Sequence, residues 1–542
     1  MKILKTAIEK NTKACILLKQ RCEMKDLTCS VYSFEDLIQG NFLYVDKTEY
    51  IWQLIRPAKG MYFLSRPRRF GKSLTLSTLE AVFEGKKELF KGLALYDKPY
   101  DWKKHPIIHL DMNGRNFGTL EKMEHSFRQI LLEQADMNGV DLQETTSDTM
   151  FHTLIKKLHD RDGDVVILLD EYDKPILNNI SKENSSDFLA ALKVFYSVIK
   201  EKNGMIRLAF ITGVSKFCHV SLFSDLNNLT DITMDARYAT MLGYTQEEFE
   251  FNFKDRIEMV SQKQNMPREE LLSEIKAWYD GFRFHAESDS VYNPVSLANF
   301  FEHGGEFNNY WFSTGTPSFL MELVKETKFD FDGILSKPVS SMAFNAFEID
   351  KLDPLTLLLQ TGYLTIKSMV KKYNMPWFWL DFPNREVSFS FNTSLVNAYT
   401  KKSDNFVVNF CEQLAESMDS GNVKQLRKTM EVFFSGISYE VHHKNESNFQ
   451  NIFFALFRLL GYYIKAESHT NDGRIDAVAE TENHVFIFEF KLDHDDSALS
   501  QIKDKEYYKQ YELSRKKIFL NGVTFDTVSG QIIDWQTEEV QH

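Results

Sequence analysis

The chain has 542 residues, a hydrophobic fraction of 43% and a formal net charge of −13. This length predicts about two to four domains of roughly 100–200 residues each, and the hydrophobic fraction is enough for proper cores. The acidic balance argues against a protein that coats nucleic acid non-specifically, although it does not exclude a local basic groove. No window approaches the roughly 18 uninterrupted apolar residues of a membrane span, and charges interrupt each apolar run near the N-terminus. The five cysteines are an odd, sparse set, which favours reduced thiols. We therefore expect a soluble, cytoplasmic protein that does not contact a membrane.

The first predicted domain follows an N-terminal appendage, residues 1–30, and spans residues 31–240. Short apolar runs alternate there with helical periodicity, which is the α/β pattern. The expected strands cover residues 61–65, 106–111, 165–170 and 207–213. Each is nearly continuous in apolar residues, so we expect a parallel sheet covered on both faces. The fold class predicted for the whole chain is α/β multidomain.

The middle region, residues 241–435, is helical and rich in aromatic residues, and we expect a helical lid. Within it, a helix over 351–362 precedes two strand-like pieces, 363–370 and 385–391. That order is typical of a winged-helix module.

The last predicted domain, residues 436–542, contains helix 446–461, three strands at 462–468, 474–480 and 484–492, helix 497–513 and strand 516–522. This αβββαβ order is that of the restriction-endonuclease core. The domain carries 11 Lys+Arg against 18 Asp+Glu, so a nucleic-acid site in it must be focused or metal-dependent.

A candidate phosphate-binding loop lies in "SRPRRFGKSLTL", residues 65–76. Gly71, Lys72 and Ser73 match G-x-x-x-x-G-K-[ST], but Arg66 stands where the first glycine belongs. In such a loop the lysine ammonium binds the β- and γ-phosphates of a nucleotide, and the serine hydroxyl binds Mg²⁺. Arg66, Arg68 and Arg69 would add positive charge beside a triphosphate, unless they form only a solvated basic loop.

A second nucleotide motif follows about a hundred residues later, where the strand "VVILLDE" ends in two acids. Asp170 would hold Mg²⁺ through water, and Glu171 would orient or deprotonate the attacking water. The two motifs together predict a nucleotide site.

The segments "FLYVDKTEYI", "FLSRPRRFGKSLTLSTL", "ILLDEYDKPI", "ITGVSKF", "YDGFRF" and "LLLQTGYLTI" resemble the AAA-ATPase-like family of prokaryotic two-part proteins. That family typically carries R-P-R-R-F-G-K-S, so Arg66 is no departure from it. The resemblance implies an ASCE-type P-loop domain that binds ATP and Mg²⁺. The implied nucleotide-binding residues are Arg68, Arg69, Phe70, Gly71, Lys72, Ser73, Leu74, Asp170 and Thr212.

The same resemblance assigns Ser73 and Asp170 to Mg²⁺ and makes Glu171 catalytic. Thr212 or Ser215 would sense the γ-phosphate. Arg283 would be a sensor-2 or finger arginine, with a structural salt bridge as the alternative. A homo-oligomer is one expectation, since AAA-like arginine fingers often come from a neighbouring subunit. For Asp46 and Lys47 in "VDKT" we predict no mechanism beyond placement near the nucleotide base.

The second candidate site lies in the last domain, where Glu489 and Lys491 are two apart on one strand and share a face. A hairpin that turns at "TENH" places Asp476 directly opposite Glu489. Two carboxylates and a lysine suit Mg²⁺-dependent phosphodiester hydrolysis. A cross-strand salt bridge is the alternative, although a charge within so apolar a strand is costly when unpaired.

Residues 446–522 resemble the PD-(D/E)xK nuclease superfamily, with Ile475 where proline is usual. The resemblance implies Asp476 and Glu489 as ligands of Mg²⁺ or Mn²⁺, Lys491 as the catalytic lysine and Glu446 as the acid of the first helix. Gln501, Lys505 and Tyr508 would line one helix face beside the site.

The sequence thus predicts an ATP-dependent or ATP-gated nuclease acting on nucleic acid, with DNA favoured over RNA. The main alternative is a nucleotide-switched interaction protein whose nuclease fold is inactive. A third reading is an ATPase with a structural tail.

Overall fold

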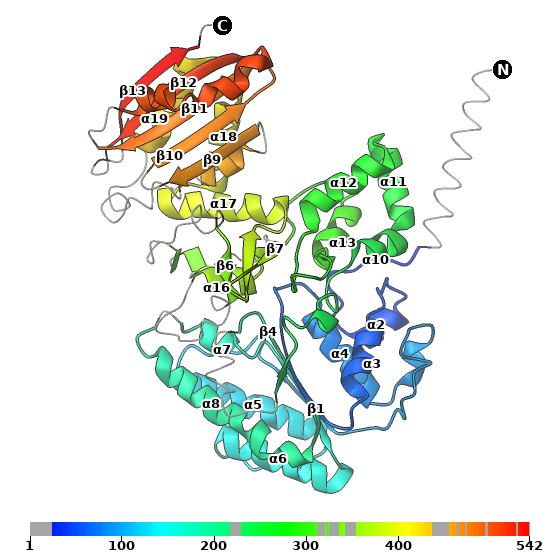
Figure 1. Cartoon of the computed structure of the whole chain (residues 1–542). Coiled ribbons are helices and arrows are strands. Elements are labelled where there is room, and N and C mark those ends of the chain that lie inside the picture. Colours follow the sequence, from blue (N-terminus) through cyan, green and yellow to red (C-terminus); the bar gives the residue numbers. More distant parts are fainter. Residues whose placement is uncertain are drawn as a thin grey trace, which may run out of the picture. The chain divides into compact units, whose positions relative to one another are not determined.

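A computed structural model describes residues 24–180, 182–216, 229–311, 320–321, 323–324, 335, 337–341, 354–435, 452, 455–461, 465–471, 474–493, 497–526, 529 and 531–540 (Figure 1). The chain divides into two compact units. The first comprises residues 1–311 and 342–366, and the second comprises residues 312–341 and 367–542.

The first unit contains a parallel five-stranded sheet in the order β2-β3-β4-β1-β5. The strands are β1 (Gly60–Ser65), β2 (Ile107–Asp111), β3 (Val165–Asp170), β4 (Ile206–Gly213) and β5 (Thr230–Asp231). The four strands predicted from sequence are confirmed to within one residue at each end. β4 lies between β1 and β3, which is the strand arrangement of ASCE P-loop sheets. Because the carboxyl ends of parallel strands meet at one edge, the loops after β1, β3 and β4 converge there.

Every residue of β3 is buried, so the strand has no solvated face. Both faces of such a parallel sheet are covered by other elements. α4 (Lys72–Phe83) packs against β3, and α2 (Phe34–Gln39) packs against α4. A separate group packs through aromatic rings, with Phe195 stacked on Phe127 at 4.2 Å and on Phe151 at 5.2 Å. That group contains α5 (Leu120–Met137), α6 (Ser147–Asp162) and α8 (Ser185–Glu201). The described residues of this region also contain α3 (Thr48–Ile55) and α7 (Lys174–Leu177), with the 3-10 turns η1 (Lys87–Phe90), η2 (Asn203–Met205) and η3 (Ala236–Tyr238).

A helical region completes the first unit, as the sequence predicted. It comprises α10 (Gln246–Asn252), α11 (Lys254–Gln264), α12 (Arg268–Tyr279) and α13 (Pro294–Glu302), with α16 (Pro354–Gln360) further along the chain. Phe249, Tyr279 and Phe300 are fully buried in its core. The aromatic runs of this region therefore supply core residues, although Phe251 is 83% exposed.

The second unit begins with a small sheet in the order β6-β8-β7 followed by three helices. The strands are β6 (Val339–Ser340), β7 (Thr365–Lys372) and β8 (Met375–Asp381), and the helices are α17 (Arg385–Thr400), α18 (Asp404–Asp419) and α19 (Val423–Ser435). The strand predicted over 385–391 is wrong, because these residues begin α17. Asn384 caps the helix by accepting a 3.0 Å hydrogen bond from the Val387 N–H.

The described residues further along the second unit include a mixed five-stranded sheet in the order β13-β12-β11-β10-β9. Its strands are β9 (Lys465–Asn471), β10 (Arg474–Glu480), β11 (His484–Leu492), β12 (Lys517–Phe525) and β13 (Ile532–Glu539). β11 and β12 are parallel, joined through α22 (Ala498–Asp504) and the 3-10 helix η7 (Tyr507–Ser514), and the other pairs are antiparallel. The sequence predicted β10 and β11 with their observed bounds, expected one helix where α22 and η7 are separate, and missed β13.

Candidate functional site

The phosphate loop, residues 66–71, connects β1 to α4. Gly71 has φ of +92°, a left-handed conformation that glycine adopts without cost, and the Thr75 N–H donates to its carbonyl as α4 begins. Lys72 is buried at 7% exposure, and its Nζ donates to the carbonyls of Arg66 and Pro67, both at 3.0 Å. Burial lowers the pKa of Lys72. The loop therefore presents a desolvated ammonium that suits a polyphosphate.

The Arg66 guanidinium is held by backbone carbonyls inside the protein, which corrects the expectation that it adds positive charge beside a triphosphate. Its side chain is fully buried, and its guanidinium donates to the carbonyls of Ser65, Thr233 and Tyr238 at 2.7–3.1 Å. The Arg66 guanidinium also lies 4.0 Å from the centre of the Phe284 ring. Arg66 thus holds the loop in place.

The other motif residues of the loop differ in where their side chains lie. Phe70 is buried and packs edge-on against Phe282 and Phe284, with ring centroids 4.8 and 5.5 Å apart. Arg69 donates to the Tyr310 carbonyl at 2.6 Å. Arg68 has an exposed side chain, and Leu74 is half-buried on α4. Of the three loop arginines, Arg68 is the most exposed.

The acid that ends β3 is the centre of a polar cluster. Asp170 is 2% exposed and accepts hydrogen bonds from the Ser73 hydroxyl at 2.5 Å and the Thr212 hydroxyl at 2.6 Å. The structure thereby brings together predicted residues from the start of α4 and the carboxyl ends of β3 and β4. A carboxylate beside a hydroxyl is an oxygen set that suits Mg²⁺ held jointly with phosphate oxygens. The residues present therefore fit a magnesium–nucleotide complex.

Tyr172 and Asp173, which directly follow Glu171, contact the loop after β4 and hold it in place. Asp173 is buried and accepts from the Ser215 N–H at 2.7 Å and the Ser215 hydroxyl at 2.6 Å. Burial raises the pKa of Asp173. A Cβ on Gly213 would approach the Tyr172 ring to 2.5 Å, so this position needs glycine for space. Ser215 is therefore engaged with Asp173, while Thr212 is the expected sensor residue that contacts Asp170.

Sequence reasoning did not assign roles to Tyr172, Asp173 or Lys174. The sequence pattern that could have indicated them is the segment DEYDK, which directly follows the apolar run VVILL.

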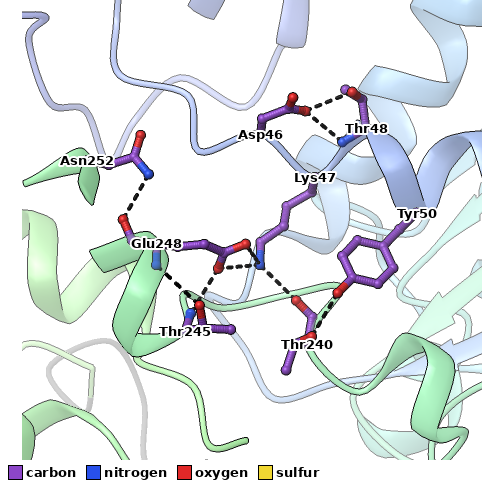
Figure 2. A network of polar contacts seen from close by, with 8 residues as sticks. All are labelled: Asp46, Lys47, Thr48, Tyr50, Thr240, Thr245, Glu248 and Asn252. Carbon is purple, nitrogen blue, oxygen red and sulfur yellow. Dashed lines mark hydrogen bonds and ion pairs between the residues drawn. The ribbon is translucent and has the colours of Figure 1, made fainter. Parts of the chain in front are cut away.

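The "VDKT" segment lies in a hydrogen-bonded network between α3 and the start of α10 (Figure 2). Lys47 Nζ donates to both Glu248 carboxylate oxygens at 2.6–2.7 Å and to the Thr240 carbonyl at 2.8 Å. Burial lowers the pKa of Lys47, while the charge of Glu248 opposes that shift. Asp46 accepts from the Thr48 N–H and hydroxyl and from the Ala94 N–H. This geometry gives "VDKT" a structural role, and its expected placement near a nucleotide base stays a prediction.

Arg283 directly follows Phe282, which forms an isolated bridge with Val291, and the Arg283 N–H donates to the Thr365 hydroxyl at 2.8 Å. It lines a pocket together with Ser65, Pro67 and other residues at the carboxyl edge of the sheet. Its sensor-2 or finger role remains a prediction.

The second candidate site lies on β10 and β11, and its predicted register is confirmed. Asp476 pairs directly with Glu489. Glu489 is fully buried, and Lys491 Nζ lies 3.3 Å from its Oε1 atom. Lys491 also donates to Gln501 Oε1 at 2.7 Å, so the predicted helix residue does contact the catalytic candidate.

Other predicted residues of this site lie elsewhere or outside the described part. Lys505 follows α22, and Tyr508 packs beside the core formed by β11, β12 and α22. Glu446 and the side chain of Asp476 lie outside the described residues.

Within the described ranges, no group of three or more His, Cys, Asp or Glu side chains could hold a metal ion. In the second site, the backbone register pairs position 476 with the buried Glu489, and the buried Lys491 lies beside Glu489. In the same part of the chain, no helix is long and apolar enough to span a membrane.

Three comparisons with known proteins bear on these sites. Residues 28–223 match the family described as predicted AAA-ATPase. Residues 444–535 match the PD-(D/E)XK nuclease superfamily. A protein of Azotobacter chroococcum mcd 1, described as an uncharacterized protein in the vnfD 5' region, is 34% identical over 528 residues, which cover 95% of this chain and 99% of that protein.

Proposed function

The chain belongs to the predicted AAA-ATPase family and carries a C-terminal domain of the PD-(D/E)XK nuclease superfamily, and from this premise we propose that it hydrolyses ATP and cleaves nucleic acid with a divalent metal. The observation that carries the proposal is the convergence of Ser73 at the start of α4 with Asp170 and Thr212 at the carboxyl ends of β3 and β4, beside the desolvated Lys72.

At the first site, Lys72 would leave the loop carbonyls and donate to the β- and γ-phosphates. Ser73 and Asp170 would hold Mg²⁺, which supplies charge neutralisation to the phosphates when bound. Glu171 would orient the attacking water and accept its proton. Thr212 would keep Asp170 oriented, since its hydroxyl donates to one carboxylate oxygen.

At the second site, Asp476 and Glu489 would hold Mg²⁺ or Mn²⁺. Lys491 would donate to the scissile phosphate as negative charge develops on it. Gln501 orients Lys491 through a 2.7 Å hydrogen bond, so it would act through the lysine. The substrate would be nucleic acid, with DNA favoured over RNA.

ATP turnover tests the first half of the proposal. We expect Mg²⁺-dependent hydrolysis by the full chain, with loss of ATP binding in Lys72→Ala. Glu171→Gln should retain binding and reduce kcat by at least about 100-fold, the scale of general-base loss. Wild-type turnover equal to that of Lys72→Ala would contradict ATP hydrolysis.

Cleavage of labelled single- and double-stranded DNA and RNA tests the second half. Metal-dependent cleavage should disappear in Glu489→Gln and in Lys491→Met. Equal activity in wild type and both variants would leave the inactive-fold alternative, in which nucleotide-dependent binding replaces cleavage.

A further inference from the structure

The backbone of Glu171 is held in an unusual conformation. Its φ is +51°, in the left-handed region that residues other than glycine rarely adopt. Such conformations persist where the surrounding structure enforces them, and they cluster at functional sites. Here the Glu171 N–H donates to Asp170 Oδ1 at 3.0 Å, and the Tyr172 N–H donates to the Thr212 carbonyl at 3.0 Å. These contacts fix the backbone position of Glu171, which directly follows β3.

The carboxylate of Glu171 is paired with a cation. Lys174 Nζ lies 3.3 Å from Glu171 Oε2, and the two side chains are 29% and 26% exposed. Glu171 is also close enough to Lys72 for its charge to act on that ammonium. The residue that would accept a proton from water thus has one carboxylate oxygen engaged by Lys174.

Lys174 is itself anchored to a neighbouring strand. Its Nζ donates to Asn113 Oδ1 at 2.6 Å, and Asn113 follows β2, the edge strand next to β3. The loop of Asn113 is ordered by its own N–H, which donates to Asp111 Oδ1 at 2.8 Å. An amide oxygen and a carboxylate oxygen therefore hold one ammonium between the ends of β2 and β3.

We propose that Lys174, anchored by Asn113, is a positioning residue that restrains Glu171 in a resting arrangement and so limits the rate of ATP hydrolysis. An ammonium that occupies a carboxylate lone pair competes with the attacking water for that oxygen. Catalysis then requires Glu171 to leave Lys174, and the free energy of the pair adds to the barrier. This inference rests on the proposed ATP hydrolysis at the first site.

The pair is partly exposed, so its strength should be modest. Partly exposed ion pairs contribute up to about 1 kcal/mol, which corresponds to a factor of about five in rate. Lys174→Met in the full chain should therefore raise kcat about two- to fivefold and leave the KM for ATP unchanged. Asn113→Ala should raise kcat by a smaller factor, because the ammonium remains but loses its anchor. Lys174→Arg, which keeps the charge, should remain near wild type.

Steady-state ATP hydrolysis with a parallel measurement of ATP binding tests the proposal. The matched control is Lys157→Met, which removes an exposed lysine that donates to the Asp141 carbonyl at 2.7 Å and should leave kcat unchanged. Glu171→Gln should cancel the gain of Lys174→Met, since the restraint acts through that carboxylate. A general loss of structure would lower kcat and would not depend on Glu171.

A kcat in Lys174→Met that is unchanged or reduced, with hydrolysis present in wild type, would overturn this inference alone. Wild-type hydrolysis no higher than that of Lys72→Ala would overturn the proposed function, and this inference with it.

Discussion

The Arg66 side chain is a buried cation whose hydrogen bonds go to backbone carbonyls. Burial lowers the pKa of Arg66, and the charge of Asp231 opposes that shift. A glycine at this position would leave the carbonyls of Thr233 and Tyr238 without these donors. The arginine thus stabilises a loop that other phosphate-binding sequences form with glycine.

Arg66→Met should destabilise the first unit by about 2–4 kcal/mol, because buried carbonyls lose donors that carry charge. Denaturant-dependent hydrogen exchange of the β1 amides measures this locally. Arg68→Met is the control, and as an exposed substitution it should change stability by less than about 0.5 kcal/mol. Equal exchange in the two variants would contradict the structural role of Arg66.

His109 on β2 forms an ion pair with Glu80 on α4, with a separation of 3.4 Å. Burial disfavours the imidazolium, but the hydrogen bond and charge of Glu80 outweigh it, so the pKa of His109 is raised. For a raised pKa, the stabilisation is full below the unfolded value of about 6.5 and is lost as pH rises through the folded pKa.

His109→Asn should therefore cost about 0.5 kcal/mol near pH 5.5 and less near pH 8.5. Denaturant unfolding at both pH values measures the difference. His152→Asn is the control, since its pair with Glu201 is more exposed, at 40% and 58%. A larger loss of unfolding free energy near pH 8.5 than near pH 5.5 would contradict the raised pKa of His109.

At the scale of elements, the Lys47–Glu248 pair joins α3 to α10, which are about 200 residues apart in sequence (Figure 2). Glu248 also closes the capping box of α10 by accepting from the Thr245 N–H at 2.8 Å. One carboxylate thus caps a helix and binds a lysine whose side chain is 12% exposed. The segment "VDKT" consequently ties the start of α3 to the helical region.

A double-mutant cycle of Lys47→Met and Glu248→Gln should give a coupling free energy of about 1–2 kcal/mol. The control cycle is Lys98–Glu49, a 2.6 Å pair that is 30% and 43% exposed and also involves α3. Its coupling should stay below about 0.5 kcal/mol. Additive effects in the first cycle would show that the two side chains act independently.

Elements with one dominant pattern could be predicted from sequence. β3 is apolar up to its last residue, Asp170, and is buried along its length, and its predicted bounds agree with the structure. The 476–489 register followed from alternation and a short turn, because a one-residue slip would exchange the two faces of each strand.

Elements whose local pattern is ambiguous could not be predicted. Residues 385–391 alternate like a strand, yet Val387, Phe391 and Leu395 are all buried at the four-residue spacing of a helix. The long-range contacts of Arg66 and Lys47 could not be predicted from a local sequence pattern, because these partners lie between about 165 and 220 residues away in the chain.

At the scale of the whole molecule, two sites of different chemistry occur in two compact units of one chain. The first has the polar cluster expected of a magnesium–nucleotide site, and the second has paired acids with a buried lysine. Their joint presence is the basis of the prediction, made from the sequence, that nucleotide state controls cleavage.

Metal-dependent cleavage of DNA by the full chain, measured with and without ATP in wild type and Lys72→Ala, tests this central claim most directly. The account predicts that ATP changes the cleavage rate of wild type and leaves Lys72→Ala unaffected, while Glu489→Gln cleaves under neither condition. Cleavage by wild type and Lys72→Ala at the same rate, with or without ATP, would contradict control of the nuclease by the nucleotide site.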